Sequence, residues 1–326
     1  MKIFEHAMKA GITRTPEFER KTLATHAVNT GIICGHQCAY CSSRSLIRTH
    51  PVFREIGESP FGTGYCVCDP TVPDRVARDA RRLRTRGMIQ FCSFSDAWAP
   101  ECQKHQLGRR CLQAILAEPD WTVRILTKNA AVRDDFDVIR EHRGRVLVGL
   151  SITGTPDRED AVTVLEPNAS SITERMLTMV EASARGLRTY AMLCPLMPGI
   201  ADSPEQIDFL VKFAAEIGTE EIFVEPVNPR GPGLKRCQEL LDVTGFTTEA
   251  AAMDHIRHRS AWSDYVTRLI YNVQISVRRH SDISKLRFLL YPTHLTSTNR
   301  NRILQDDAGV IWLGKEEATK AVSPAP

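Results

Sequence analysis

The sequence has no apolar run whose length approaches the about 18 residues of a membrane-spanning helix, so we expect no membrane partner. Its first twenty residues are polar and of mixed charge, which is not typical of a signal peptide. No glycine-rich dinucleotide or P-loop fingerprint follows the first expected strand. An excess of one charge is also lacking, because the net charge is only +3, which does not by itself indicate nucleic acid.

Cysteine, in contrast, is plentiful. Ten cysteines without a secretory signal indicate a reducing compartment, where thiols bind metals or lie buried, and we expect a cytoplasmic protein. Hydrophobic residues make up 42% and charged residues 25%, which is ordinary for a globular protein. The 326 residues suffice for one large α/β domain with an appendage.

Three of the thiols, Cys34, Cys38 and Cys41, fall within eight residues at the spacing C-x3-C-x2-C. The run 28–33 before them predicts a buried strand, which would place the thiols at a strand's carboxyl end, where α/β proteins carry their chemistry. Three soft ligands on one loop fit an iron-sulfur cluster with one iron that lacks a local ligand. A structural zinc is the alternative, although it normally takes four ligands, and His36 would reach the same metal only with a strained backbone.

The rest of the chain alternates between expected strands and helices. After a leader (1–27), residues 42–73 hold many turn formers and are expected to be a long crossover. The expected strands are 28–33, 88–94, 122–126, 146–152, 187–193 and 221–225. The expected helices are an arginine-rich one ending at Gly87 and others near 105–117, 134–142, 173–184 and 203–217. This rhythm predicts a parallel sheet, and the pattern alone leaves a doubly wound sheet and a barrel both open.

The part after 235 departs from this rhythm. We expect a helix near 262–277, strands near 286–291 and 310–313, and a frayed tail from Lys315 to Pro326. The expected organisation is therefore a leader (1–27), a core (28–235) and a C-terminal extension (236–326) that closes the open side of the core.

Five motifs in order carry a family resemblance over about residues 28–228. They are the cysteine loop with Tyr40 before its last cysteine, SDAWAPE (95–101), TKN (127–129) with Arg133-Asp134, LEP (165–167) with Glu174-Arg175, and PLMPG (195–199). Together they resemble the spore photoproduct lyase-like branch of the radical S-adenosylmethionine (SAM) superfamily, often labelled DNA repair photolyase-like.

The resemblance implies an α/β fold, a partial (β/α)6 TIM-type barrel of the radical SAM kind with a C-terminal α+β extension. It implies that Cys34, Cys38 and Cys41 hold a [4Fe-4S] cluster and that S-adenosyl-L-methionine binds its fourth iron. The implied reaction is reductive cleavage of SAM to a 5′-deoxyadenosyl radical, which abstracts hydrogen from a substrate. A reductant such as flavodoxin or ferredoxin would supply the electron.

The resemblance also implies cofactor-binding roles at strand ends. Asp96 and the neighbouring Ser93 would face the methionyl ammonium, and Lys128 would neutralise the SAM carboxylate. The alternatives are a loop-capping aspartate and a surface lysine. Tyr40 and Pro195 would lie near the adenine. Cys194, next to Pro195, is expected to be a buried thiol of the core.

Two further strand-end positions leave alternatives open. Ser151 would reach the methionyl or ribose groups, or its hydroxyl is satisfied by its own strand. Glu166 would bind a ribose hydroxyl or pair with Arg175 as a structural bridge.

One departure from the family concerns the hydrogen donor. Spore photoproduct lyases carry a cysteine where this chain has Ser93, so repair of thymine dimers is not the expected reaction. Cys92 is adjacent, but strand alternation would point it to the opposite face. Cys66 and Cys68, in the expected crossover, are the other candidate catalytic thiols, as a hydrogen donor, a redox pair or ligands of a second cluster, or they are unremarkable loop thiols.

The substrate is not identified by these motifs. Nucleic acid is the first hypothesis, from the branch resemblance and from the arginine cluster at 75–86, which is either a phosphate-contacting patch or a solvated helix face. A peptide or a small metabolite is the alternative substrate. A non-catalytic iron-sulfur redox or regulatory protein and a zinc-binding nucleic-acid module are the alternative classes.

Overall fold

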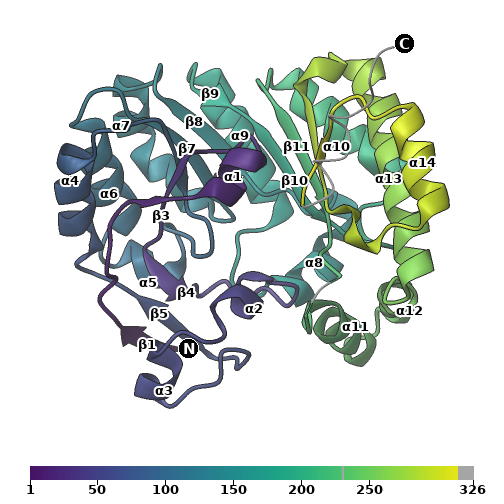
Figure 1. Cartoon of the computed structure of the whole chain (residues 1–326), viewed down its shortest axis with the longest axis horizontal. Coiled ribbons are helices and arrows are strands. Elements are labelled where there is room, and N and C mark those ends of the chain that lie inside the picture. The colour runs from purple at the N-terminus through teal and green to yellow at the C-terminus, as the bar shows by residue number, and fades with distance from the viewer. Residues whose placement is uncertain (230, 315–326) are drawn as a thin grey trace, which may run out of the picture.

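The computed structural model describes residues 1–229 and 231–314, and the expected frayed tail lies outside this range. Three sheets organise the chain (Figure 1). The six-stranded sheet has the order β2 (Thr13–Arg14), β3 (His26–Val28), β6 (Met88–Phe91), β7 (Thr122–Thr127), β8 (Val146–Leu150) and β9 (Arg188–Thr189). The four-stranded sheet has the order β10 (Ala191–Leu196), β11 (Ile222–Pro226), β12 (Leu286–Leu290) and β13 (Val310–Trp312). The small sheet has the order β1 (Lys2–Glu5), β5 (Tyr65–Cys68) and β4 (Gly31–Ile33).

The two larger sheets are parallel except where β2 pairs with β3. An isolated parallel bridge between Ser151 and Met192 joins them. The parallel α/β arrangement agrees with the expectation. A barrel is not confirmed, because the strands divide into two sheets and no pairing within the described residues joins β13 to β2 or β3.

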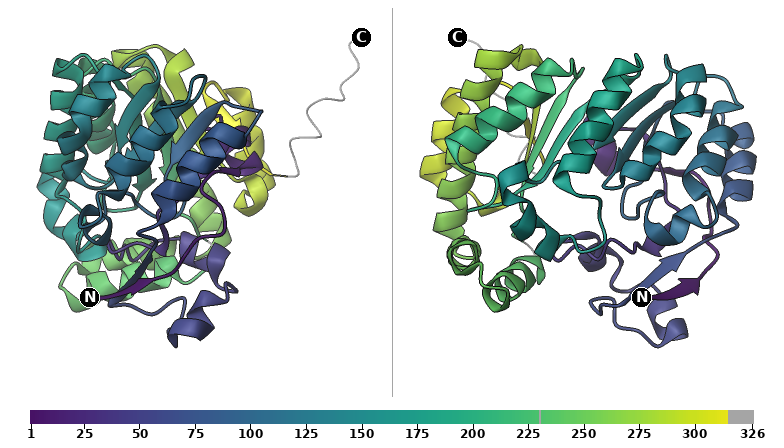
Figure 2. Two further views of the ribbon diagram at one scale, coloured as in Figure 1. Left: turned by 90° about the vertical axis from the view of Figure 1, so that its left-hand side faces the viewer. Right: turned by 180° about the vertical axis from the view of Figure 1, so that it is seen from behind.

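Helices cover one face of the two larger sheets. This face is turned toward the viewer in the right-hand view of Figure 2. The helices of the first half are α1 (Pro16–Arg20), α2 (Ser43–Ile47), α3 (Val52–Ile56), α4 (Val72–Arg82), α5 (Pro100–Gln103), α6 (Leu107–Leu116), α7 (Phe136–Glu141) and α8 (Glu159–Leu165). Those of the second half are α9 (Ile172–Ala184), α10 (Pro204–Glu216), α11 (Gly233–Val243), α12 (Thr247–His255), α13 (Arg259–His280) and α14 (Ser297–Gln305). Short 3-10 helices span Ala130–Asp135, Pro156–Arg158, Ile283–Lys285 and Pro292–His294. No described helix is long and apolar enough to cross a lipid bilayer.

Alternation along each strand separates two cores. In β8, Val146, Val148 and Leu150 belong to the main core, which also contains the buried faces of α6, α9, α10 and α13, while Leu147 belongs to a smaller inner core. Gly149 is required by close packing, because a Cβ there would lie 2.4 Å from the ring of Tyr190. The inner core takes one residue each from β10, β11 and β12, together with Leu23 of the N-terminal segment.

Two expectations about the first half of the chain were wrong. The run 28–33 is not one strand, because β3 ends at Val28 and β4 begins at Gly31 in a different sheet. The side chain of Asn29 explains the break, since its Oδ1 accepts hydrogen bonds from the backbone N–H groups of Ser93 and Phe94. The expected crossover 42–73 also contains α2, α3 and β5, and β5 pairs with both β1 and β4.

The C-terminal extension continues the fold of the core. β12 pairs in parallel with β11, and β13 with β12, so the extension lengthens the second sheet. The leader approaches the same region, where the Tyr291 hydroxyl donates to Glu17 of α1 at 2.8 Å. The N-terminal leader, which supplies β2 and β3 of the first sheet, therefore also contacts the C-terminal extension.

Candidate active site

The cysteine loop directly follows β4 and lines a pocket whose empty volume, open solvent included, is about 930 Å³. The other walls come from the last residues of β7, β10 and β11 and from the segments that follow β6, β7, β8 and β11. Because these strands are parallel, their carboxyl ends meet at one edge, where loops carry chemistry in α/β folds.

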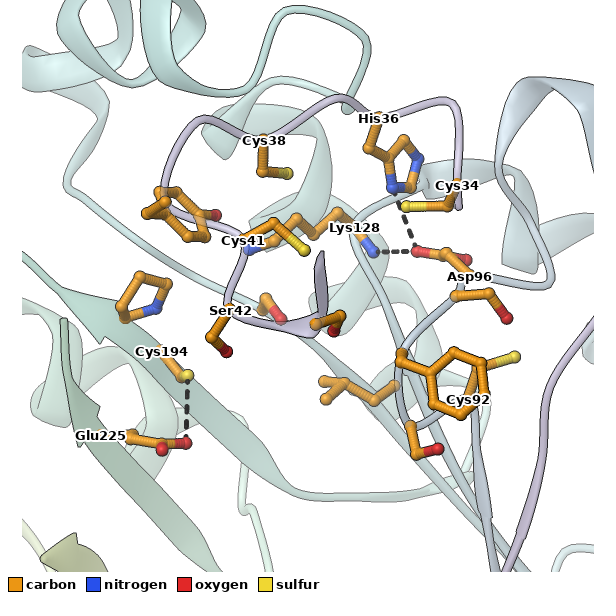
Figure 3. Close-up of a pocket in the computed structure, with 18 of the residues that line it drawn as sticks. Cys34, His36, Cys38, Cys41, Ser42, Cys92, Asp96, Lys128, Cys194 and Glu225 are labelled. Carbon is orange, nitrogen blue, oxygen red and sulfur yellow. Dashed lines mark hydrogen bonds and ion pairs between the residues drawn. The ribbon is translucent and has the colours of Figure 1, made fainter. Parts of the chain in front are cut away.

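The sulfur atoms of Cys34, Cys38 and Cys41 point toward a common space in the pocket (Figure 3). Within the described residues, no three His, Cys, Asp or Glu side chains are gathered closely enough to hold one metal ion. Burial raises the pKa of the Cys34 thiol, and it raises that of Cys38 to about 12, with Glu166 adding to the shift. Both thiols are therefore protonated near neutral pH in the metal-free protein, and metal binding would release their protons.

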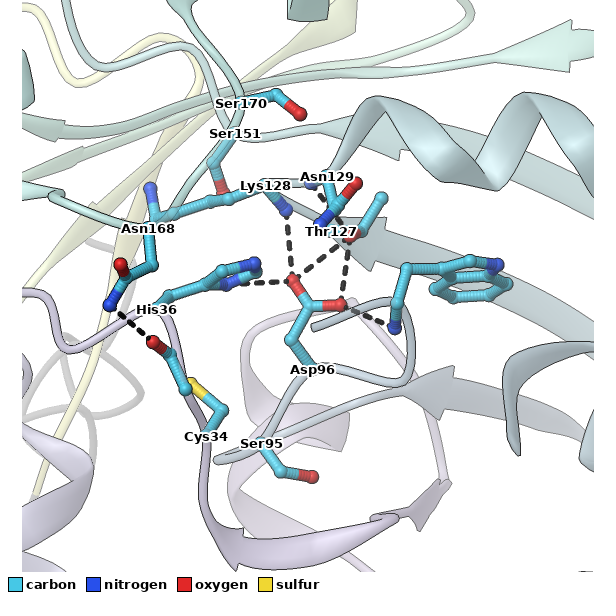
Figure 4. A network of polar contacts seen from close by, with 12 residues as sticks. Cys34, His36, Ser95, Asp96, Thr127, Lys128, Asn129, Ser151, Asn168 and Ser170 are labelled. Carbon is cyan, nitrogen blue, oxygen red and sulfur yellow. Dashed lines mark hydrogen bonds and ion pairs between the residues drawn. The ribbon is translucent and has the colours of Figure 1, made fainter. Parts of the chain in front are cut away.

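Asp96 is the centre of a polar network at the pocket wall (Figure 4). Its carboxylate accepts from the Thr127 hydroxyl at 2.8 Å, from the Lys128 backbone N–H at 2.9 Å and from the Trp98 backbone N–H at 2.9 Å. His36 Nδ1 lies 3.3 Å from the same carboxylate. Asp96 thus caps its own loop, which was the alternative role, and it also joins the ends of β6 and β7 to the cysteine loop.

His36 is buried, and its burial lowers its pKa, so the imidazole is neutral. With Nδ1 directed at Asp96, this nitrogen is the one that donates. His36 therefore serves the network of Asp96, and the structure does not place it as a fourth ligand beside the three thiols.

Glu166 occupies the layer behind the pocket. Its carboxylate accepts from the Tyr40 hydroxyl, from Arg175 and, at 2.9 Å, from Thr153, and Lys128 Nζ lies 3.2 Å away. Burial alone would raise the pKa of Glu166, but the charges of Arg175 and Lys128 lower it to about 2. Of the two predicted roles, the structure shows the structural bridge between Glu166 and Arg175. Neither residue lines the pocket.

Most of the other expected site residues do line the pocket: Tyr40, Cys92, Ser93, Asp96, Lys128, Ser151 and Pro195. The ammonium of Lys128 lies 5.5 Å from the ring centroid of Tyr40. Lys128 is thus an ion-paired lysine of the pocket wall, not a surface lysine.

The candidate catalytic thiols separate into two groups. Cys92 and Ser93 both line the pocket, because β6 ends at Phe91 and strand alternation does not extend to them. The prediction that Cys92 faces away was therefore wrong. Cys66 and Cys68 are buried within β5 and do not line the pocket, so the structure does not place them as catalytic thiols, and they are not loop residues either.

The sequence analysis missed several wall residues. Glu225 at the end of β11 lines the pocket, and its Oε2 accepts a hydrogen bond from the Cys194 thiol at a distance of 3.6 Å. Its place at the end of an expected strand was a usable signal. Asn29 does not line the pocket but holds the loop after β6, and it had no such signal, because its partners lie more than sixty residues away.

Comparisons with known proteins were made for sequence and for structure. No protein-family model matches the chain. An uncharacterized protein of Acidianus two-tailed virus is 24% identical over 221 residues, 66% of this chain and 71% of that protein. An uncharacterized protein of Methanocaldococcus jannaschii is 25% identical over 181 residues, 55% of this chain and 63% of that protein. One of Mycobacterium tuberculosis is 25% identical over 202 residues, 61% of this chain and 57% of that protein.

Solved structures of spore photoproduct lyase share the fold. The lyase in complex with dinucleoside spore photoproduct aligns with a TM-score of 0.53 at 15% identity, over 74% of this chain and 66% of the lyase. A mutant lyase with bound AdoMet and the same dinucleoside aligns with a TM-score of 0.52 at 14% identity. The likeness supports, at the level of the fold, the lyase-like relationship that the motifs indicate, and it spans just under two thirds of the lyase chain.

Proposed function

We propose that this protein is a radical SAM enzyme. The observation that carries the proposal is the convergence of three thiols with Tyr40 and Lys128 in one pocket at the carboxyl ends of parallel strands. Thiolates from one loop are the ligands that iron-sulfur clusters use, and three of them leave one iron for another ligand. A bound [4Fe-4S] cluster would supply the electron for reductive cleavage of SAM to a 5′-deoxyadenosyl radical, which takes hydrogen from the substrate.

The chain's own residues fit this chemistry. Cys34, Cys38 and Cys41 would hold the cluster, and the pocket beside them is bounded by charged and polar side chains suited to an amino acid group. Lys128 is the pocket-lining ammonium for a carboxylate, and Asp96 with the loop from Ser93 is the acidic wall for an ammonium. Tyr40, Ser151 and Pro195 form the part of the wall that remains for the nucleoside.

Glu166 and Arg175 act through other residues. Glu166 holds both the Tyr40 hydroxyl and the Lys128 ammonium, so it fixes two pocket side chains without entering the pocket. Arg175 donates to Glu166 and, at 2.8 Å, to the Ser151 carbonyl. The pair therefore orients three wall residues from behind.

A thiol for hydrogen transfer is present on the pocket wall. Cys92 lies next to Ser93, and burial raises its pKa to about 12, which keeps it as the S–H form that donates a hydrogen atom. We propose Cys92 as the candidate donor and withdraw Cys66 and Cys68 from this role, because they do not line the pocket.

We propose nucleic acid as the first substrate class to test and an acidic electron carrier such as flavodoxin or ferredoxin as the reductant. The support is the shared fold with a lyase solved with a dinucleoside photoproduct. The arginine cluster contributes no side chain to the pocket, because α4 lies on the outer layer of the molecule (Figure 1). Two of its arginines form ion pairs, Arg75 with Asp69 and Arg86 with Glu118.

The test is anaerobic reconstitution with iron and sulfide, followed by reduction, addition of SAM and measurement of 5′-deoxyadenosine. We expect the wild-type protein to bind about four irons and to release deoxyadenosine. A variant with Cys34, Cys38 and Cys41 replaced by alanine should do neither. Cys111→Ala is the matched control, because Cys111 is a buried thiol outside the pocket, and it should behave as the wild type.

Other outcomes decide against the proposal. A colourless protein with one zinc would favour a zinc-binding module. A four-iron protein that cleaves no SAM, with or without oligonucleotides, peptides or metabolite extracts, would indicate a non-catalytic iron-sulfur protein.

A further inference from the structure

A second buried acidic side chain, Glu101, contacts the cysteine loop. Glu101 belongs to α5, and its side chain is one of the most buried acidic groups of the described chain, with 3% of the residue exposed. Its Oε1 accepts the backbone N–H of Gly35 at 2.9 Å. Its Oε2 has no hydrogen-bond partner within the described residues.

The contact is at the residue that follows the first expected cluster ligand. Gly35 lies between Cys34 and Cys38, so the direction of its peptide group sets how these two thiols face each other. The carbonyl of Gly35 is also held, because Asn168 Nδ2 donates to it at 2.8 Å. Both polar groups of one loop residue are thus held by side chains that follow β6 and β8 in the chain.

Glu101 approaches so closely that residue 35 has no room for a side chain. A Cβ at this position would lie 2.3 Å from Glu101 Oε2 and 2.6 Å from the Met1 methyl group. Glycine at this position is therefore explained by the approach of Glu101, since its φ is not in the left-handed region.

A third contact acts on the same loop. Gln37 has a left-handed φ of 56°, which is unfavourable for a residue with a side chain. Its side-chain amide offsets this cost, because Nε2 donates to the carbonyls of Cys34 at 3.1 Å and Tyr65 at 2.8 Å. The loop is therefore constrained between the two cysteines by contacts within it and around it.

We infer that Glu101 is the principal positioning residue of the cluster-binding loop and that Asn168 assists it. This inference rests on the proposed cluster. The hydrogen bond to Glu101 is buried, whereas the one from Asn168 competes with water because Asn168 is exposed, so we expect the Glu101 bond to constrain the loop more. Partners of metal ligands that act in this way typically change metal affinity about 10- to 100-fold when removed.

The experiment measures how firmly the reconstituted protein keeps its iron. We would compare wild type, Glu101→Ala, Glu101→Gln and Asn168→Ala by iron content, by the electron paramagnetic resonance spectrum of the reduced cluster, and by the rate of iron loss to a chelator. We expect Glu101→Ala to lose iron about tenfold faster and to show an altered spectrum, and Asn168→Ala to lose it about two- to threefold faster with a smaller spectral change. Glu101→Gln keeps an acceptor for the Gly35 N–H and should restore most of the retention.

Two variants separate positioning from general destabilisation. Gln103→Ala, on the same helix, removes a side-chain hydrogen bond to the Trp98 carbonyl at 2.9 Å and should retain iron as the wild type does. Gly35→Ala should weaken retention in the wild type, but it should add little to Glu101→Ala, because the clashing carboxylate is then absent and the exposed, flexible Met1 side chain can move away.

The inference is overturned if Glu101→Ala keeps its iron as firmly as wild type, or if Glu101→Gln is no better than Glu101→Ala. If Glu101→Ala does not fold, an Asn168→Ala protein with an unchanged spectrum and unchanged retention is the overturning result. These readouts do not require SAM cleavage, so a protein that holds a cluster but cleaves no SAM would fail the proposed function and leave this test intact. A wild-type protein that takes up no cluster would overturn both.

Discussion

Glu166 keeps a negative charge in a site that excludes water. Its carboxylate is stabilised by Arg175 and Lys128, and together they lower its pKa from 4.5 to about 2 despite burial. A carboxyl whose pKa is lower in the folded state contributes stability above its unfolded pKa and loses it as the pH falls through the folded pKa. We expect the free energy of unfolding of the metal-free protein to fall between pH 4.5 and 2, by on the order of 3 kcal/mol from this residue.

Urea unfolding at a series of pH values tests this expectation with Glu166→Gln. The variant should have a smaller pH slope in that window and should be less stable at pH 7 by about 3–5 kcal/mol, because Arg175 loses its buried partner. Glu216→Gln is the control, since Glu216 forms an exposed i,i+4 pair with Lys212 and should leave the slope unchanged. Equal slopes in wild type and Glu166→Gln would contradict the assignment.

Residue roles were predictable from the sequence only where the partners are close in the chain. Cys34, Cys38 and Cys41 share one loop, so their spacing indicates a common ligand. Asp96 contacts Thr127 and Lys128 of another strand, and Glu166 contacts Tyr40 across 126 positions. Such contacts depend on how strands align, which the local pattern does not contain.

At the scale of elements, α10 shows a helix whose start is determined locally. The Ser203 hydroxyl accepts the backbone N–H of Gln206 at 3.2 Å, and the Gln206 side chain accepts the Ser203 N–H at 3.3 Å. Two otherwise free backbone donors are satisfied by this capping box. We expect Ser203→Ala to lower the free energy of unfolding by about 1 kcal/mol, measured by urea denaturation.

The matched variant for this helix is Ser203→Asp, which keeps an acceptor at the cap and should stay close to wild type. Iron content should not change in either variant, because Ser203 does not line the pocket. A Ser203→Ala protein as stable as wild type would show that the cap does not limit this helix.

Elements whose ends are set by distant contacts were predicted less well. The capping box and terminal glycine of α10 are local signals, and the expected helix matches the observed one closely. The run 28–33 has no local break signal strong enough to divide it, yet β3 and β4 belong to different sheets. The division is produced by β5, which pairs with β4, and by the loop after β6, which binds Asn29.

At the scale of the whole molecule, the N-terminal segment joins two sheets that are connected, among the described residues, by a single strand bridge. Leu23 packs into the inner core with residues such as Phe223 and Leu289 of the second sheet. Its carbonyl accepts a 2.9 Å hydrogen bond from Arg124 of the first sheet. In Figure 1, α1 accordingly lies in front of the space between the two sheets.

This placement predicts a large effect of a small change in the segment. Leu23 is 4% exposed, and Leu23→Ala should lower the free energy of unfolding by about 2–5 kcal/mol, because the inner core is left with a cavity. Leu177→Ala removes the same atoms from a residue that is 59% exposed and should cost less than about 0.5 kcal/mol. If urea denaturation shows similar losses for both variants, the leader does not contribute to the core. A single cooperative transition in wild type that divides into two in Leu23→Ala would show that the segment also couples the sheets.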